Sequence, residues 1–188
     1  MYQIAVSGAA KGDSVEEGKE LARAMGAAIA DAGHALLSGA TIGLPNYAAE
    51  SYKQAGGKMS VGISPASSKV EHILKYRLPT EAYDTILYTG LHYIGRDTLL
   101  ITSSDAVVSI GGRIGTLHEF TIAVESDTPI AFLQGAGGIS DEIQTLLSLA
   151  HPLREQNEII FSDSPTELIH ELTKTLDRMH GHYKGLYY

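Results

Sequence analysis

The sequence predicts a Rossmann-like α/β fold in which a mainly parallel sheet carries helices on both faces. Short apolar runs alternate with longer amphipathic stretches, which is the pattern of successive βαβ units. Three of the apolar runs lead into glycine-rich segments, where a strand is expected to turn sharply into a helix. The length of 188 residues suits one core of ordinary size, so we expect one domain over residues 1–188.

Seven short apolar runs are predicted to form the strands, and helices are expected to fill most of the gaps between them. The strands are predicted at Gln3–Val6, Ala35–Ser38, Met59–Ile63, Thr85–Tyr88, Ala106–Ile110, Ile130–Leu133 and Ile159–Phe161.

Capping signals predict the ends of three helices. The first begins with a capping box between Ser14 and Glu17 and ends before Gly33. The second carries Pro45 in its first turn and ends near residues 56–57, and the last opens with the segment Ser164-Pro165-Thr166-Glu167.

Three further segments complete the predicted organisation. A helix is predicted from Tyr93 to about Thr102. Residues 64–83 lack a clean period and are predicted to be a long excursion from the sheet. Residues 179–188 are predicted to be a terminal tail.

Composition excludes several classes of function. With 22 acidic and 14 basic residues the net charge is −8, and no basic cluster is present, so nucleic acid is not expected as a partner. The chain has no cysteine, which excludes disulfides and thiolate-bound metals and favours a cytoplasmic location. No apolar run reaches the roughly 20 residues that a membrane helix needs.

The main chemical signal is the segment from Asp105 to Glu119, an apolar strand followed by a glycine-rich turn and a helix. Backbone N–H groups at such a turn, with the positive end of the helix dipole, can bind a phosphate. The spacing is neither GxGxxG nor a P-loop, and the glycines alone are equally consistent with a tight structural turn. Two other glycine-rich strand ends, at residues 7–12 and 38–45, are expected on the same sheet edge, and together the three loops predict a pocket.

On these residues the chain resembles the LOG ("Lonely guy") proteins, long labelled lysine decarboxylases, within the wider SLOG superfamily. The family pattern is Pro-Gly-Gly-x-Gly-Thr-x-x-Glu, preceded by an Arg-Lys pair nine residues before a Ser-Asp strand start. Arg96 stands nine residues before Asp105, and the turn then supplies Gly111, Gly112, Gly115, Thr116 and Glu119 in order. The resemblance covers nearly the whole chain.

Four departures from the family pattern point to a separate branch of the superfamily. Ile110 stands in place of the proline, the turn has one extra residue, and Asp97 stands where lysine follows the arginine. The loop at residues 38–46 is also altered.

The resemblance implies a nucleotide-binding site, and it suggests hydrolysis of the N-glycosidic bond of a nucleoside 5′-monophosphate without metal or organic cofactor. Glu119 would stabilise an oxocarbenium-like ribose, and Arg96 would clamp the phosphate or the departing base. The ligand-binding residues expected at the three loops are Gly8, Gly39, Thr41, Gly43, Gly111, Gly112, Arg113, Gly115 and Thr116. Tyr93 and His72 are further candidates by proximity.

Alternatives remain for each of these interpretations. Thr116 and Glu119 have the spacing of a capping box, and Arg96 with Asp97 could form a solvated charge pair on a helix face. The whole protein could also be a non-catalytic carrier or sensor of a nucleotide-like ligand such as molybdenum cofactor, which the missing lysine and the longer turn would suit. No lysine has a sequence context that suits a pyridoxal Schiff base, so decarboxylation is not expected.

The resemblance also predicts a homodimer. Apolar, alanine-rich helical segments at residues 21–32 and 120–124 could exceed what one core covers.

Overall fold

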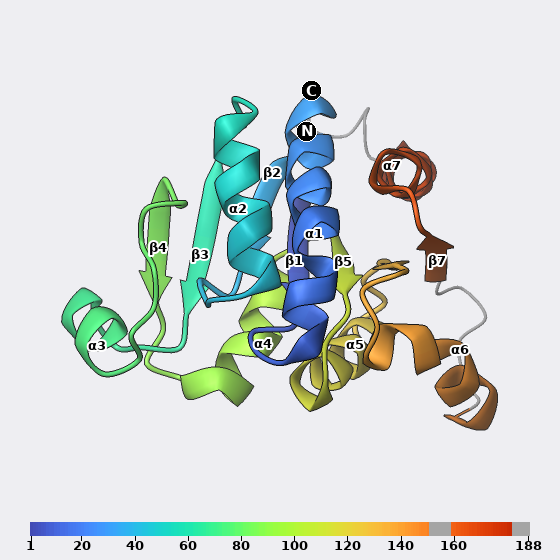
Figure 1. The fold of residues 1–188 in the computed structure, drawn as a ribbon. Helices are drawn as coiled ribbons and strands as arrows, with labels where there is room; N and C mark the ends of the chain where they lie inside the picture. Colours follow the sequence, from blue (N-terminus) through green and yellow to red (C-terminus); the bar gives the residue numbers. More distant parts are fainter. Residues whose placement is uncertain (151–158, 182–188) are drawn as a thin grey trace.

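A computed structural model describes residues 1–150 and 159–181, in which seven strands form one entirely parallel sheet (Figure 1). The order across the sheet is β4-β3-β2-β1-β5-β6-β7, and every neighbouring pair is parallel. The strands are β1 Gln3–Gly8, β2 Ala35–Ser38, β3 Ser60–Ser64, β4 Thr85–Tyr88, β5 Ala106–Ile110, β6 Ile130–Leu133 and β7 Ile159–Ser162. The predicted Rossmann-like class is confirmed, with all rather than most of the sheet parallel.

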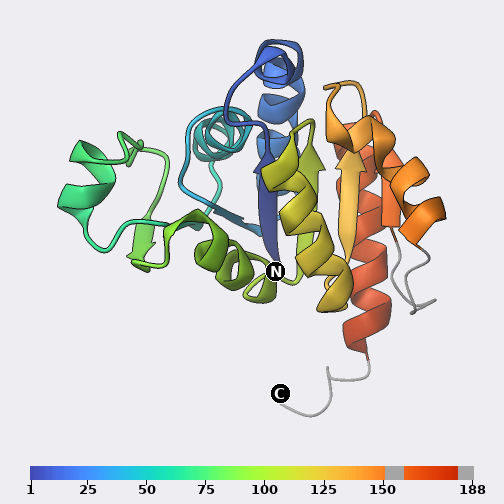
Figure 2. The same ribbon diagram turned by 90° about the horizontal axis from the view of Figure 1, so that it is seen from below.

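Helices cover both faces of the sheet and divide the buried side chains into two clusters. Successive side chains of β1 point to opposite faces of the sheet. Ile4 and Val6 therefore lie in the cluster under α1, α2 and α7, and Ala5 lies in the cluster under α4, α5 and α6. The helices are α1 Asp13–Asp31, α2 Leu44–Gln54, α3 Lys69–Leu74, α4 His92–Thr102, α5 Ile114–Glu125, α6 Ile139–Ala150 and α7 Pro165–His180. Figure 2 shows α3 beyond β4 at one end of the sheet and α6 and α7 at the other.

The chain reverses its direction of travel across the sheet at β1. It runs outward from β1 through β2 and β3 to β4, then returns through α4 to β5 on the other side of β1. The loops after β1 and β5 therefore leave in opposite directions, and such a switch point is where open parallel sheets bind ligands. Gly8 is paired with Ile110, so both strands end at the same level.

Helix starts differ from the prediction more than strands do. The Ser14–Glu17 capping box is wrong, because α1 begins at Asp13 after Gly12 and has no side-chain cap. The last helix is as predicted, since Ser164 accepts a hydrogen bond from the Glu167 amide. The excursion at residues 64–83 contains the short helix α3, capped by Ser68.

The C-terminal expectations need one correction. Helix α7 continues to His180, so residues 179 and 180 belong to a helix and not to a tail. Residues 182–188 lie outside the described part of the chain. No described helix has both the length and the apolar character that crossing a membrane requires.

Candidate functional site

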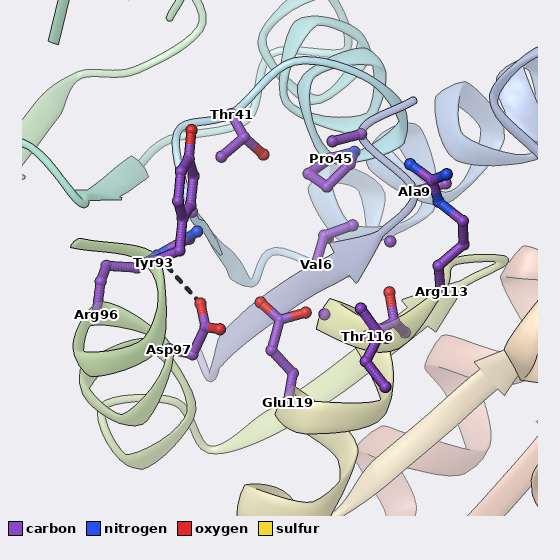
Figure 3. Close-up of a pocket in the computed structure, with 15 residues that line it drawn as sticks. Val6, Ala9, Thr41, Pro45, Tyr93, Arg96, Asp97, Arg113, Thr116 and Glu119 are labelled. Carbon is purple, nitrogen blue, oxygen red and sulfur yellow. Dashed lines mark ion pairs between the residues drawn. The ribbon is translucent and has the colours of Figure 1, made fainter. Parts of the chain in front are cut away.

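A cavity of about 550 Å³ opens at the carboxyl edge of the sheet, beside the switch point (Figure 3). Its walls come from β1, from the loops after β1 and β2, from the first turn of α2, and from the first two turns of α4 and α5. The lining residues are Val6, Gly8, Ala9, Ala10, Gly39, Thr41, Pro45, Tyr93, Arg96, Asp97, Arg113, Ile114, Gly115, Thr116 and Glu119. The volume lies within the range of roughly 300–1,000 Å³ that is usual for small-ligand pockets.

The structure brings most of the predicted site residues together at this cavity. All of them line it except Gly43, Gly111 and Gly112. Tyr93, a candidate by proximity, also lines it, whereas His72 does not. His72 is fully buried between the Ser64 hydroxyl and the Pro79 carbonyl, at 2.8 and 2.9 Å from its two ring nitrogens.

The glycines that do not line the cavity shape its loops. A Cβ atom on Gly112 would lie 2.1 Å from the Thr116 hydroxyl, at a backbone φ of 101° that favours glycine. The carbonyl of Gly112 accepts a hydrogen bond from the Ile139 amide at 2.9 Å, so this part of the turn faces α6. The segment of the turn that faces the cavity is therefore Arg113–Thr116, at the N-terminus of α5.

Glu119 is one of two buried acids in the cavity wall, the other being Asp97. It projects from α5 toward β1, where the Ser7 hydroxyl donates a hydrogen bond to its Oε2 atom. Burial and, to a smaller extent, the nearby Asp97 charge raise the pKa of Glu119 to about 7, against the opposing effects of Arg96 and Ser7. At neutral pH this carboxyl group can therefore give or take a proton.

The capping interpretation of Glu119 is wrong. Helix α5 begins at Ile114 after Arg113, without a side-chain cap, so Thr116 lies inside the helix. A residue inside the first turn cannot be the N-cap of that helix. The carboxyl group of Glu119 is instead turned toward Ser7 and the cavity.

Arg96 occupies a slot that Gly39 leaves open. Only 4% of Arg96 is exposed, and a Cβ atom on Gly39 would lie 1.5 Å from the Arg96 Nη1 atom. The Arg96 Nε atom lies 3.2 Å from Asp97 Oδ1, but it makes no hydrogen bond among the described residues. The pair is thus a buried ion pair in the cavity wall, and the expectation of a solvated pair on a helix face is wrong.

Asp97 places a second carboxyl group beside Glu119. Burial raises its pKa, while the charges of Arg96 and His118 lower it. Figure 3 shows the carboxyl groups of Asp97 and Glu119 turned into the same space from α4 and α5. The wall therefore holds two acids and one buried arginine, and the partly buried His118 lies behind Asp97 on the α5 side.

Sequence reasoning missed the role of Ser7 and the orientation of Asp97. The signal for Ser7 was its place at the end of β1, just before Gly8, where side chains of a parallel sheet meet the ligand edge. Within the described residues, no group of three or more His, Asp or Glu side chains is close enough to hold a metal ion.

Comparison with known proteins shows the family of this chain. A profile described as the SLOG cluster4 family matches residues 1–169. An uncharacterised protein of Archaeoglobus fulgidus is 32% identical over 134 residues, which is 71% of this chain and 81% of the relative.

Three solved structures share the fold over almost their entire length. The structural-genomics target TM1055 has a TM-score of 0.80 at 26% identity, covering 93% of this chain and 99% of TM1055. The molybdenum cofactor binding protein of Rippkaea orientalis has a TM-score of 0.72 at 26% identity, covering 93% and 96% of the two chains. The molybdenum cofactor carrier protein of Chlamydomonas reinhardtii has a TM-score of 0.73 at 26% identity, covering 93% and 98%.

Proposed function

The chain belongs to the SLOG cluster4 family, and from that premise we propose that it binds and carries a phosphorylated nucleotide-type ligand, of which molybdenum cofactor is one example. Two similar structures are named for molybdenum cofactor, which supports a carrier over an enzyme. The observation that carries the proposal is the cavity itself, which joins a helix N-terminus at Arg113–Thr116 to the buried polar wall of α4.

The phosphate of the ligand would lie against the first turn of α5. The free N–H groups and positive dipole end of this 12-residue helix face the cavity, and Arg113 adds a charge at the rim. Gly115 has open space around its Cα atom, so a phosphate can approach the backbone there. The remainder of the ligand would extend toward Tyr93 and Asp97.

Asp97 favours a carrier, which only binds the ligand, rather than an enzyme, which converts it. A lysine at this position, as in the LOG pattern, would add a positive charge for phosphate next to Arg96. The carboxyl group instead lies 3.2 Å from the Arg96 Nε atom and offsets the arginine charge. Phosphate would then be held at one end of the cavity only.

One observation favours a second function, hydrolysis of a nucleoside 5′-monophosphate. Glu119 has its pKa raised to about 7, near the ideal for a general base, and it lies between the phosphate end and the Asp97 end of the cavity. In that reaction the C1′–N bond breaks, its electron pair leaves with the base, and water adds to C1′. Glu119 would accept a proton of the water and pass it to the departing base nitrogen, giving free base and ribose 5-phosphate.

Calorimetry with a panel of nucleoside 5′-monophosphates, followed by an assay for free base, separates the two functions. We expect saturable binding without base release, and we expect isolated molybdenum cofactor to stay with the protein through anaerobic gel filtration. Arg113→Ala should weaken phosphate binding by about tenfold, because a charge-assisted contact is lost. The matched control Arg23→Ala, on the outer surface of α1, should leave it unchanged.

Two results would overturn the proposal. Catalytic release of base would identify the hydrolase, and a failure to bind any of these ligands would remove the carrier. The proposal includes a cytoplasmic location and a homodimer. It also includes no nucleic acid partner, and the argument for this last point is the net charge of −8.

A further inference from the structure

We propose that the end of the cavity lined by Arg96 and Asp97 recognises the 2-amino-4-oxo pyrimidine edge that guanine and pterins share. Asp97 would accept hydrogen bonds from the two adjacent N–H groups of that edge. This inference rests on the proposed function, since it assumes that the cavity takes a nucleotide-type ligand. It names which ring system the ligand carries.

The first argument is that Asp97 has unused acceptor capacity inside the cavity. Only 9% of its side chain is exposed, and among the described residues its one close contact with a donor is the ion pair with the Arg96 Nε atom. A buried carboxylate normally has its lone pairs filled by donors. Because Asp97 lines the cavity, a ligand is the donor that can fill them.

The second argument is that Arg96 sets a donor next to this acceptor. The buried Arg96 Nε atom makes no hydrogen bond to any residue that the structure describes, and Gly39 leaves room for the guanidinium group at the cavity wall. A donor and an acceptor side by side match a ring edge that presents an oxo group followed by two N–H donors. Guanine and pterins present this order. Adenine instead presents an amino donor followed by a ring nitrogen acceptor.

The third argument concerns how the ring would be held and where the phosphate would go. Tyr93 lies one helical turn before Arg96 and Asp97, and its ring lines the cavity beside them, so it can stack on a planar base. Figure 3 shows Arg113 and Thr116 on the opposite side of the cavity from Tyr93. A base at Asp97 therefore leaves its phosphate free to reach the first turn of α5.

The test compares the monophosphates of guanosine, inosine, xanthosine and adenosine by calorimetry on the full chain. Inosine lacks the 2-amino group, so its monophosphate should bind about ten- to a hundredfold more weakly than the guanosine compound, the usual loss for a hydrogen bond to a charged group. Xanthosine, which presents an oxygen at that position, and adenosine should bind at least as weakly as inosine. This ranking needs no variant.

Asp97→Asn supplies a sharper test because the amide presents one acceptor and one donor. It should weaken guanosine monophosphate binding by about ten- to a hundredfold and strengthen xanthosine monophosphate binding, which reverses the preference. The matched control Asp31→Asn, at the exposed end of α1, should leave the ranking unchanged. A thermal melt of each variant checks that it is folded.

A second pair of ligands separates the two sources of this ring edge. The phosphate ester of 6-hydroxymethylpterin is compared with its lumazine analogue, in which an oxo group replaces the 2-amino group. If only the pterin binds more tightly than its comparison compound, the lumazine, the site is a pterin site. If only guanosine monophosphate binds more tightly than its comparison compounds, the other monophosphates, the site is a guanine nucleotide site. Equal binding of all bases would overturn this inference and leave the proposed function standing, whereas no binding by any ligand would overturn the proposed function itself.

Discussion

Glu119 lies in surroundings that oppose its charge, and this makes the stability of the fold depend on pH. Burial raises its pKa from 4.5 to about 7 in the folded chain. Between these two pH values the unfolded chain has released the proton and the folded chain still binds it, so the free energy of unfolding falls as the pH rises. The whole penalty is present above the folded pKa.

Glu119→Gln should therefore stabilise the protein at pH 8 and have little effect at pH 4.5. The amide stays neutral and still accepts the Ser7 hydrogen bond, so at pH 8 the free energy of unfolding should rise by about 3 kcal/mol. Urea unfolding at the two pH values measures this. Glu125→Gln, at the exposed end of the same helix, is the control and should show no such difference. Equal stability of wild type and Glu119→Gln at pH 8 would contradict the assignment of the raised pKa.

At the residue scale, a local pattern could predict which residues lie close together. The spacing of Arg96, Gly115, Thr116 and Glu119 predicted that these residues would share a site, and all four line the cavity. Ser7 could not be found this way, because its contact with Glu119 joins residues 112 positions apart and depends on the pairing of β1 with β5. No spacing rule relates such positions.

The loop after β2 and helix α4 fit together only because residue 39 has no side chain. A Cβ atom there would lie 1.5 Å from the Arg96 Nη1 atom and within 3 Å of the whole end of the guanidinium group. The guanidinium is the far end of a flexible side chain, so Gly39→Ala should displace it and leave the sheet intact. We expect ligand affinity to fall by about tenfold or more while the melting temperature changes little.

Calorimetry and a thermal melt on the same samples test this expectation. Gly181→Ala is the matched control, because a Cβ atom there meets none of the described residues within 4 Å. A loss of folding without any loss of affinity in the folded fraction would show that Gly39 serves packing alone.

At the scale of elements, strands were predicted better than helix ends. Apolar runs bounded by turn residues gave β2, β4, β5 and β6 with the bounds that the structure has. Helices α1, α2 and α5 instead begin after Gly12, Gly43 and Arg113, none of which supplies a side-chain cap. Side-chain capping rules cannot locate starts that are set by loop packing around a ligand edge.

The whole molecule is expected to be a homodimer, as the family resemblance implies, but the apolar helical segments that were a second reason do not supply the surface. The segments at residues 21–32 and 120–124 bury their large apolar side chains in the core of one chain, as Met25, Ile29 and Phe120 show. Large exposed apolar residues lie instead on α3, α4 and the start of α5, among them Ile94 at 74% and Ile114 at 80% exposure. Exposed apolar side chains on neighbouring elements favour association.

Sedimentation at micromolar concentration tests this prediction. We expect a species of about twice the 20.1 kDa chain mass, because closed twofold dimers are the commonest assembly. A single species at 20.1 kDa over the whole concentration range would remove the dimer and leave the ligand pocket unaffected.

The parallel direction of all strands could be predicted from the alternating pattern, but the order of the strands across the sheet could not. The alternation required parallel strands, and it placed three glycine-rich loops on one edge, where the structure has them. The return of the chain from β4 to β5 across β1 is set by which faces pack together, which no single segment encodes.

The slot that Gly39 leaves for Arg96 also restricts how this protein can evolve. A side chain at position 39 displaces the Arg96 guanidinium group, and that clash disappears once the arginine is lost. Substitutions at the two positions are therefore epistatic, because a change at residue 39 costs ligand affinity only while Arg96 is present. A lineage that gave up Arg96 would be free to vary at residue 39, and a later arginine could occupy the slot only after glycine was restored.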